Sequence, residues 1–311
     1  MWRRVWRPHA TGPNFVSTSF SQPLGAHVEP GKIRGYYLDL RVKANSPSWP
    51  PSWYEGPRKT MWVALTQIGL GSHERYISGE GDQWLETAIG AADELVAEQE
   101  RDGARHGSWL HRFPLPHTFP LSIPWTSALS QGQAASLLVR IAKLTSDERY
   151  EQAARAALVP MRRASADGGV VALLDGHPFF EEYPTDPPSF VLNGYMFGLW
   201  GSYDVAVGLG DASALELLQE GLDGLASNIG RFDTGYWSRY DLYPHRVTNI
   251  ASLAYHELHV DQLRATALLT DREELAEAAD RFAGYRNGPL NVARATARKV
   301  MFRLAVPRTF E

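Results

Sequence analysis

The chain has 311 residues, 44% of them hydrophobic and 21% charged, and a formal net charge of −4 at pH 7. This composition predicts a globular protein with a substantial core. A net negative charge argues against nucleic acid as a partner. The absence of cysteine excludes disulfides, a thiolate nucleophile and thiolate metal ligands.

Residues 1–58 contain eight prolines, and prolines interrupt helices. We therefore expect an N-terminal arm here, irregular or with short strands, followed by a main domain over residues 59–311. The basic start of the chain lacks the apolar run of a signal peptide, and no stretch reaches the length of a membrane-spanning helix. A soluble protein is expected, either cytoplasmic or exported by a route that this sequence does not show.

Beyond residue 60 the hydrophobic pattern is that of helices. Apolar residues at helical spacing are typical of a helix with one buried face, and the clearest stripe comprises Leu85, Ala88, Ile89, Ala92, Leu95 and Val96. Similar stripes run through residues 137–144, 215–225 and 275–282. The main body is therefore expected to be all-α.

Four polar junctions recur along the main body at intervals of roughly 60 to 65 residues, a spacing that indicates a repeated helical hairpin. They begin near residues 79, 145, 208 and 270. In two of them, Thr145 with Glu148 and Thr270 with Glu273, the spacing is that of a capping box.

The connections between the predicted hairpins are long at residues 101–125 and 171–189. An open solenoid does not need connections of this length, and long loops on a rigid frame are common places for functional sites. We therefore predict an incomplete (α/α) toroid closed around a central cleft.

Residues 180–204 combine an unusual turn with an ordinary helix. The second half has apolar residues at helical spacing, whereas the first half places two carboxylates and a tyrosine before a proline-rich turn. Glu182 and Tyr183 would then stand at the mouth of a helix. The alternative interpretation is a solvated acidic turn with a packed tyrosine.

Two later segments add further polar and aromatic groups. Residues 234–243 hold three tyrosines and an arginine in a loop that contains a glycine hinge. On the next predicted helix Tyr255, His259 and Gln262 fall on one face, which suggests that they line a cleft. His256 and His259 are weak candidates for metal ligands because no carboxylate stands at a matching offset, so we expect no metal.

These segments, in this order, resemble the C-terminal domain of D-glucuronyl C5-epimerases, which convert glucuronate to iduronate within heparan-type chains. The resemblance rests on Glu181-Glu-Tyr-Pro-Thr with Ser189-Phe-Val-Leu-Asn-Gly194, on Tyr240-Asp-Leu242, on Tyr255-His with His259 and Gln262-Leu263, and on an upstream segment from Trp125 to Arg140. It is closest between about residues 124 and 285. It implies an (α/α) toroid, a homodimer and a polysaccharide substrate that contains uronic acid.

Epimerisation at C5 removes a proton next to a carboxylate and returns one to the opposite face of the sugar ring, so it requires two acid/base groups. The resemblance implies that Glu182 and Tyr255 are this pair, with Tyr183 and Tyr240 in support. This chemistry needs no cofactor.

The substrate carboxylate also requires a cation. The family has an arginine after the Tyr-Asp-Leu triplet, where this chain has Tyr243, so Arg239, His245 and Arg246 are the candidates to replace it. This departure and the net negative charge favour a non-sulfated, glucuronate-containing polymer such as heparosan. Further candidates for substrate binding come from the resembling segments, namely Gln131, Asn193 and His259, and from loops that mix rings with cations, namely Trp53, Trp109, His111, Arg112, His117 and Trp125.

Three other functions remain open at this point. A polysaccharide lyase would use the same C5 carbanion to expel the 4-linked sugar, and its product would absorb in the near ultraviolet. A glycoside hydrolase would pair Glu182 with a second acid, for which Asp204, Asp233 and Asp241 are available. A non-catalytic glycan-binding protein would keep the fold without the chemistry.

Overall fold

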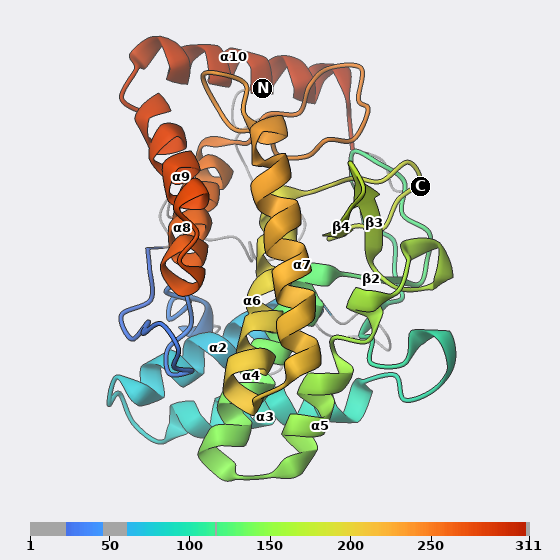
Figure 1. Ribbon diagram of the computed structural model, residues 1–311, viewed down its shortest axis with the longest axis vertical. Coiled ribbons are helices and arrows are strands. Elements are labelled where there is room, and N and C mark those ends of the chain that lie inside the picture. Colours follow the sequence, from blue (N-terminus) through green and yellow to red (C-terminus); the bar gives the residue numbers. More distant parts are fainter. Residues whose placement is uncertain (1–22, 46–60, 116, 309–311) are drawn as a thin grey trace.

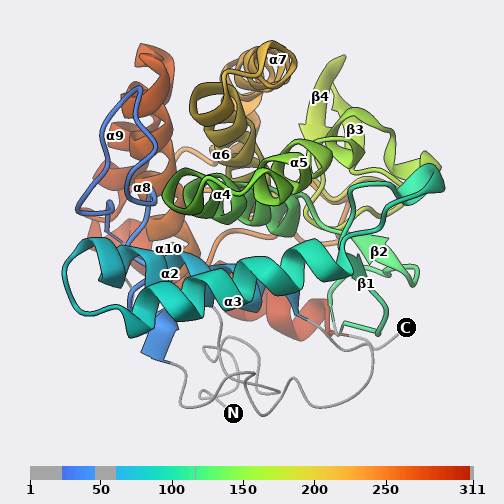
Figure 2. The same ribbon diagram turned by 90° about the horizontal axis from the view of Figure 1, so that it is seen from below.

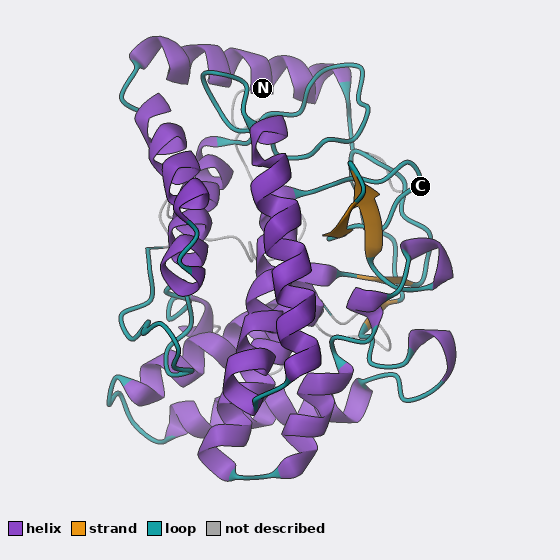
Figure 3. Ribbon diagram, in the orientation of Figure 1, coloured by secondary structure: helices purple, strands orange, loops and turns teal. Residues whose placement is uncertain are grey.

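A computed structural model describes residues 23–45, 61–115 and 117–308 of the chain. Helices dominate this part of the protein, and its strands are confined to two short antiparallel hairpins (Figure 3). The prediction of a mostly helical protein is confirmed. No helix in the described ranges is long and apolar enough to cross a membrane.

Four helical hairpins follow one another along the chain (Figure 1). Their bounds are α2 (Trp62–Ile77) with α3 (Gln83–Glu98), α4 (Ala128–Thr145) with α5 (Glu148–Ala156), α6 (Leu192–Leu209) with α7 (Ala212–Asn228), and α8 (Leu253–Thr270) with α9 (Glu273–Tyr285). The first helices pack on one another in the order α2, α4, α6 and α8. In Figure 2 the first three hairpins lie one above another, and the α8–α9 hairpin stands beside them at the left. All four predicted junctions join two helices.

The two predicted capping boxes are wrong, because each threonine still belongs to the preceding helix. Thr145 donates its hydroxyl to the Ile141 carbonyl at 2.8 Å, and Thr270 donates to the Thr266 carbonyl at 2.7 Å. The N-cap positions of the next helices fall two residues later, at Asp147 and Arg272. The cap of α5 is instead Asp147, whose carboxylate accepts the Arg149 amide at 3.0 Å.

The central helices α4 and α6 approach each other closely because glycines face each other across their contact. A Cβ atom added at Gly132 would lie 2.0 Å from the Phe197 carbonyl oxygen, and one added at Gly201 would lie 2.5 Å from the Gly132 Cα. Any larger side chain would push the two helices apart. The helices that carry the site are therefore held in tight register at their centre.

Residues 23–45 form an irregular arm with isolated β-bridges and a short 3-10 helix, η1 (Lys43–Asn45). The arm contacts the C-terminal parts of the inner helices. Arg140 of α4 is fully buried and donates to Asp204 of α6 at 2.7 Å and to the Gly35 carbonyl of the arm at 2.7 Å. The predicted arm boundary at residue 58 lies outside the described residues.

The remaining elements surround the other end of the inner helices. Strand β1 (Leu110–His111) pairs with β2 (Trp125–Thr126), and β3 (Val171–Leu174) pairs with β4 (His177–Phe180). Short 3-10 helices occupy Gly103–Arg105, Pro160–Arg162, Ser165–Asp167 and Ile229–Phe232. All of these connections lie between or beside the hairpins, so they leave the helical frame uninterrupted.

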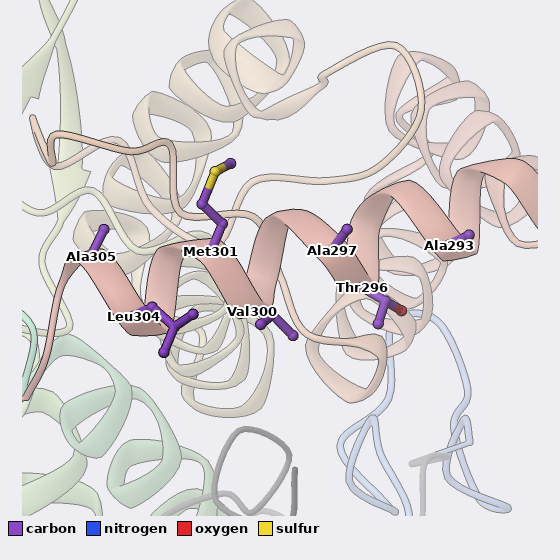
Figure 4. A pocket seen from close by; sticks show the side chains of 7 residues that line it. All are labelled: Ala293, Thr296, Ala297, Val300, Met301, Leu304 and Ala305. Carbon is purple, nitrogen blue, oxygen red and sulfur yellow. The ribbon is translucent and has the colours of Figure 1, made fainter. Parts of the chain in front are cut away.

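Helix α10 (Pro289–Ala305) crosses beyond the α8–α9 hairpin, at the top of Figure 1. It buries Ala295, Lys299 and Phe302 against the body of the protein. Its other side carries a shallow apolar groove (Figure 4) lined by Ala293, Thr296, Ala297, Val300, Met301, Leu304 and Ala305. The two sides of α10 therefore differ in chemistry, and the buried side faces the candidate site.

Candidate active site

The candidate site is built where α4, α6 and α8 begin. Its carboxylate comes from the turn between β4 and α6, and its tyrosines come from that turn, from the segment before α8 and from the first turn of α8. Backbone hydrogen bonds join these segments: Ala128 donates to the Glu181 carbonyl at 2.9 Å, and Leu192 donates to the Tyr240 carbonyl at 3.2 Å. Residues that are distant in sequence are thereby held together.

Glu182 lies almost completely inside this cluster, with 6% of its surface exposed. The Asn193 amide donates to its carboxylate at 3.0 Å. A Cβ atom at Gly194 would lie 2.3 Å from the Glu182 Cβ, so only glycine allows this approach. Burial raises the pKa of Glu182 to about 7, against the polar groups of Tyr183 and Asn193, which lower it.

The neighbouring Glu181 has a structural role. Its carboxylate accepts the amides of Ser189 and Phe190, each at 2.9 Å, and the Ser189 hydroxyl. Phe190 has a φ of 50°, a left-handed conformation that is unfavourable for a bulky residue. Glu181 therefore holds the strained turn that leads into α6, while Glu182 faces the tyrosines.

Three tyrosines share the electrostatic environment of Glu182. The rings of Tyr240 and Tyr255 meet edge to face with centroids 4.9 Å apart, and the Tyr240 hydroxyl lowers the pKa of Tyr255. Burial, followed by the Glu182 charge, raises the pKa values of Tyr183, Tyr240 and Tyr255. Each phenol therefore keeps its proton at neutral pH while Glu182 is ionised.

Rings from the predicted 101–125 loop extend the cluster. His117 lies 4.5 Å from the Tyr183 ring and Trp125 lies 5.7 Å from it, measured between centroids. His111 stacks on Trp125 at 3.9 Å. An aromatic wall of this kind suits the apolar face of a sugar ring.

Other predicted binding residues lie outside the cluster. Gln131 is fully buried and bonds the Trp109 amide and the carbonyls of Gly107 and Ala157 at 2.8 to 3.0 Å, so its amide holds the core together. Trp109 is also buried and donates to the Leu95 carbonyl at 2.9 Å. Exposed Arg112 pairs with Glu100, and Trp53 lies outside the described residues.

Of the three cations predicted near the triplet, Arg246 and His245 are engaged elsewhere. Arg246 is exposed and donates to the Ala305 carbonyl at 2.7 Å. His245 lies 3.5 Å from Asp241, and its ring packs on Tyr243. Arg239 is half-buried and its charge interacts with Asp241 and Arg231, but its Nε has no hydrogen-bond partner among the described residues. Tyr243, at the position of the family arginine, packs on Phe119 with centroids 5.2 Å apart.

His259 and His256 share one serine. The Ser238 hydroxyl lies 2.7 Å from His256 Nδ1 and 2.9 Å from His259 Nδ1, and His256 Nε2 lies 2.9 Å from the Phe282 carbonyl. Because a carbonyl only accepts, His256 carries its proton on Nε2, and Ser238 donates to His256 Nδ1 and accepts from His259 Nδ1. His259 Nε2 is thereby left as a buried acceptor without a hydrogen-bond partner in the described structure.

Burial lowers the pKa values of both histidines, that of His256 to about 4, so both stay neutral at physiological pH. Across residues 23–45, 61–115 and 117–308, no group of three histidine, cysteine, aspartate or glutamate side chains is arranged to hold a metal ion.

Sequence reasoning missed the contribution of α10 and the residues after it. Lys299 Nζ lies 5.6 Å from the centroid of the Tyr240 ring, and the charges of Arg303 and Arg308 act on the Tyr255 hydroxyl. Lys299 and Arg303 stand four residues apart, so they lie on adjoining turns of the same side of the helix. That spacing was visible in the sequence, but it could not show which neighbour the side faces.

The fold defines the chain as a protein of successive helical hairpins. Its structure is similar to that of the unsaturated glucuronyl hydrolase of Bacillus sp. GL1, with a TM-score of 0.50 and 18% identity over 72% of this chain and 62% of that chain. At this identity the likeness describes the fold alone.

Residues 102–284 match the family model described as the D-glucuronyl C5-epimerase C-terminus. The chain is 34% identical over 244 residues to the D-glucuronyl C5-epimerase of Caenorhabditis elegans, a match that covers 73% of this chain and 39% of that protein. It is 30% identical over 235 residues to the uncharacterised protein MJ1128 of Methanocaldococcus jannaschii, a match that covers 74% of this chain and 72% of that protein. The chain belongs to the D-glucuronyl C5-epimerase family, and the predicted catalytic residues all lie within the matched range.

Proposed function

We propose that this protein is a polysaccharide uronate C5-epimerase that interconverts D-glucuronate and L-iduronate residues, and that its hairpins form an incomplete (α/α) toroid around the substrate. The observation that carries the proposal is the buried cluster in which the Glu182 carboxylate interacts with the Tyr255 and Tyr183 hydroxyls. Membership of the C5-epimerase family supports the same reaction.

The chemistry requires a base and an acid on opposite faces of the sugar ring. Ionised Glu182 takes the C5 proton, and the electron pair of the broken C–H bond moves into the neighbouring carboxylate to form an enolate-like intermediate. Tyr255 then gives a proton to the other face of C5, while Tyr240 donates a hydrogen bond to the resulting phenolate. In the reverse direction the two residues exchange roles.

The pKa of Glu182 suits this assignment. With a pKa of about 7, Glu182 is substantially ionised at neutral pH and yet basic enough to accept a proton. Burial and the Glu182 charge raise the pKa of Tyr255, so Tyr255 begins protonated and becomes a stronger acid once the C5 proton neutralises Glu182. Arg303 and Arg308 lower that pKa and would stabilise the phenolate once it forms.

The candidate acids for a glycoside hydrolase are held in other interactions, which favours the epimerase. Asp204 pairs with Arg140 in the core. Asp233 accepts the Tyr285 hydroxyl at 2.8 Å and pairs with Arg281. Asp241 accepts the Asn249 amide at 2.6 Å. Asp204 and Asp233 are therefore paired with arginines, whereas Asp241 keeps one buried oxygen without a hydrogen-bond partner among the described residues.

The substrate that we propose is a non-sulfated polymer such as heparosan, because a chain of net charge −4 is poorly suited to bind many sulfates.

A homodimer, which the family resemblance implies, is also part of the proposal. Sedimentation analysis of the purified chain would measure its oligomeric state.

The test is incubation of the whole chain with heparosan in deuterium oxide, followed by nuclear magnetic resonance. We expect exchange of the C5 proton and the appearance of iduronate, with no change in near-ultraviolet absorbance. New absorbance would identify a lyase, and shortened chains without absorbance would identify a hydrolase. Binding without C5 exchange would indicate a non-catalytic protein and contradict the proposal.

A further inference from the structure

Three cations from the C-terminal part of the chain converge on the tyrosine cluster. Lys299 and Arg303 belong to α10, and Arg308 follows it. The charges of Arg303 and Arg308 act on the hydroxyls of both Tyr240 and Tyr255. All three cations lie beyond residue 284, where the match to the family model ends.

The ammonium group of Lys299 is held by hydrogen bonds within the protein. It is buried and donates to the Asn249 side chain and to the Ile250 carbonyl, each at 2.7 Å. The Asn249 amide in turn donates to Asp241 at 2.6 Å. Lys299 therefore fixes the segment that presents Tyr240, and its charge is compensated through Asn249.

Arg303 is in a different situation. Its guanidinium packs 5.8 Å from the centroid of the Phe302 ring, but within the described ranges it forms no hydrogen bond and no ion pair. Burial and the charge of Arg308 lower the pKa of Arg303 to about 10. The Arg303 guanidinium therefore acts on the tyrosines without a hydrogen-bond or ion-pair partner among the described residues, which leaves its donors available to an anion.

We infer that Arg303, with Arg308 beside it, binds the carboxylate of the uronate residue that undergoes epimerisation. The inference rests on the proposed function and names a cation that would bind the substrate carboxylate. A guanidinium fork matches a carboxylate with two parallel hydrogen bonds. Charge that flows into this carboxylate when C5 loses its proton would be stabilised by the same contact.

The matched control is Arg298 on the same helix. Five residues separate it from Arg303, which turns its side chain away by about 140°. Arg298→Gln and Arg303→Gln therefore remove the same charge from the same helix on different sides. Arg303→Lys keeps the charge and removes the fork.

The experiment measures the binding of heparosan and of carboxyl-reduced heparosan, in which glucose replaces glucuronate, together with the melting temperature of each variant. We expect Arg303→Gln to weaken the binding of heparosan by about 10- to 100-fold, the scale of a hydrogen bond to a charged group. Its affinity for the reduced polymer should be unchanged. Arg303→Lys should lose less affinity for heparosan than Arg303→Gln does. Arg298→Gln should bind both polymers as the wild type does.

The melting temperature separates a binding role from a structural one. The half-buried Arg303 has no hydrogen bond or ion pair among the described residues to lose, so Arg303→Gln should melt at the same temperature as the wild type or higher. A lower melting temperature, or equal losses for both polymers, would assign Arg303 to the structure and overturn the inference. A wild type that does not distinguish the two polymers would also overturn it.

Failure of this inference is distinct from failure of the proposed function. If the wild type exchanges the C5 proton while Arg303→Gln binds heparosan normally, the epimerase activity is supported and the role of Arg303 in binding the carboxylate is refuted. If Arg303→Gln loses affinity for heparosan alone while the wild type never exchanges the C5 proton, the role of Arg303 in binding is supported and the epimerase activity is refuted.

Discussion

The side-chain amide of Asn193 donates a 3.0 Å hydrogen bond to the Glu182 carboxylate. The backbone carbonyl of Asn193 accepts a hydrogen bond from the side-chain amide of Gln262, on α8, at 3.0 Å. Asn193 lies in the first turn of α6. One residue thus connects the proposed base to the helix that carries Tyr255, so the relative position of the two proposed proton-transfer groups depends on it.

We expect Asn193→Ala to shift the pH dependence of C5 exchange. The Asn193 bond lowers the pKa of Glu182, which lies at about 7. Its loss removes support from the charged form, so the pKa should rise and the exchange rate should reach its plateau about one pH unit higher. Deuterium exchange measured between pH 5 and 9 checks this, with Asn228→Ala, a buried asparagine of α7, as the control. An unshifted profile would mean that Glu182 is not the titrating base.

Removal of either proton-transfer group should abolish inversion. Tyr255→Phe deletes only a hydroxyl and Glu182→Gln keeps the shape of the side chain, so losses of roughly 100-fold or more would report proton transfer and not packing. The surviving group should still exchange the C5 proton on its own face. Tyr285→Phe is the control, because its hydroxyl bonds Asp233. Near-normal inversion by Tyr255→Phe would transfer the role to Tyr183 or Tyr240.

Glu182→Gln should stabilise the protein above neutral pH. The pKa of Glu182 is about 7 in the folded protein, against 4.5 for a free carboxyl, so folding favours the protonated form. This contribution is complete below pH 4.5 and is lost as the pH rises through 7. Urea unfolding should therefore give similar free energies for variant and wild type at pH 4.5, and an advantage for the variant of up to about 3 kcal/mol at pH 8.

Glu181→Gln is the contrasting variant. Glu181 has the same raised pKa of about 7, but its carboxylate accepts the Ser189 and Phe190 amides. Glutamine retains a single acceptor oxygen, so a backbone amide of the strained turn loses part of its bonding. We expect a loss of about 1 to 3 kcal/mol at neutral pH. Stabilisation by both substitutions would refute the different roles assigned to the two carboxylates.

The buried pair of Arg140 and Asp204 should attach the arm to the inner helices. Arg140→Met leaves the Asp204 charge uncompensated in the core, which typically costs about 3 to 5 kcal/mol. Arg140→Met combined with Asp204→Leu should recover part of that loss, because no buried charge remains. Chemical denaturation measures both. A double variant that is less stable by the full sum of the two single losses would show that the pair is not coupled.

Catalysis should survive chelation. The proposed proton transfers use only a carboxyl and phenols, so C5 exchange should be unchanged in EDTA. Loss of exchange that one added metal restores would contradict this expectation and return attention to His256 and His259.

Local pattern predicted the helices of this protein well. The stripe from Leu85 to Val96 lies within α3, and the four junctions each connect a pair of helices. Such features depend on neighbours three and four residues apart, which the sequence displays directly. The capping boxes failed because a threonine at a helix end can bond backward as well as forward, and the sequence does not show where the preceding helix stops.

The sequence by itself determined the helical class, the family and the short list of acid/base candidates, because periodicity and motif spacing are local properties. Tertiary structure decided which candidates meet. Gln131 and Asn193 are both buried amides in recognised segments, yet Gln131 bonds only core backbone while Asn193 reaches Glu182. Arg303 appeared in no predicted site, yet it acts on Tyr255. Contacts between residues so distant along the chain depend on how the hairpins pack. The spacing of residues in one helix does not indicate which side chains of another helix will contact it.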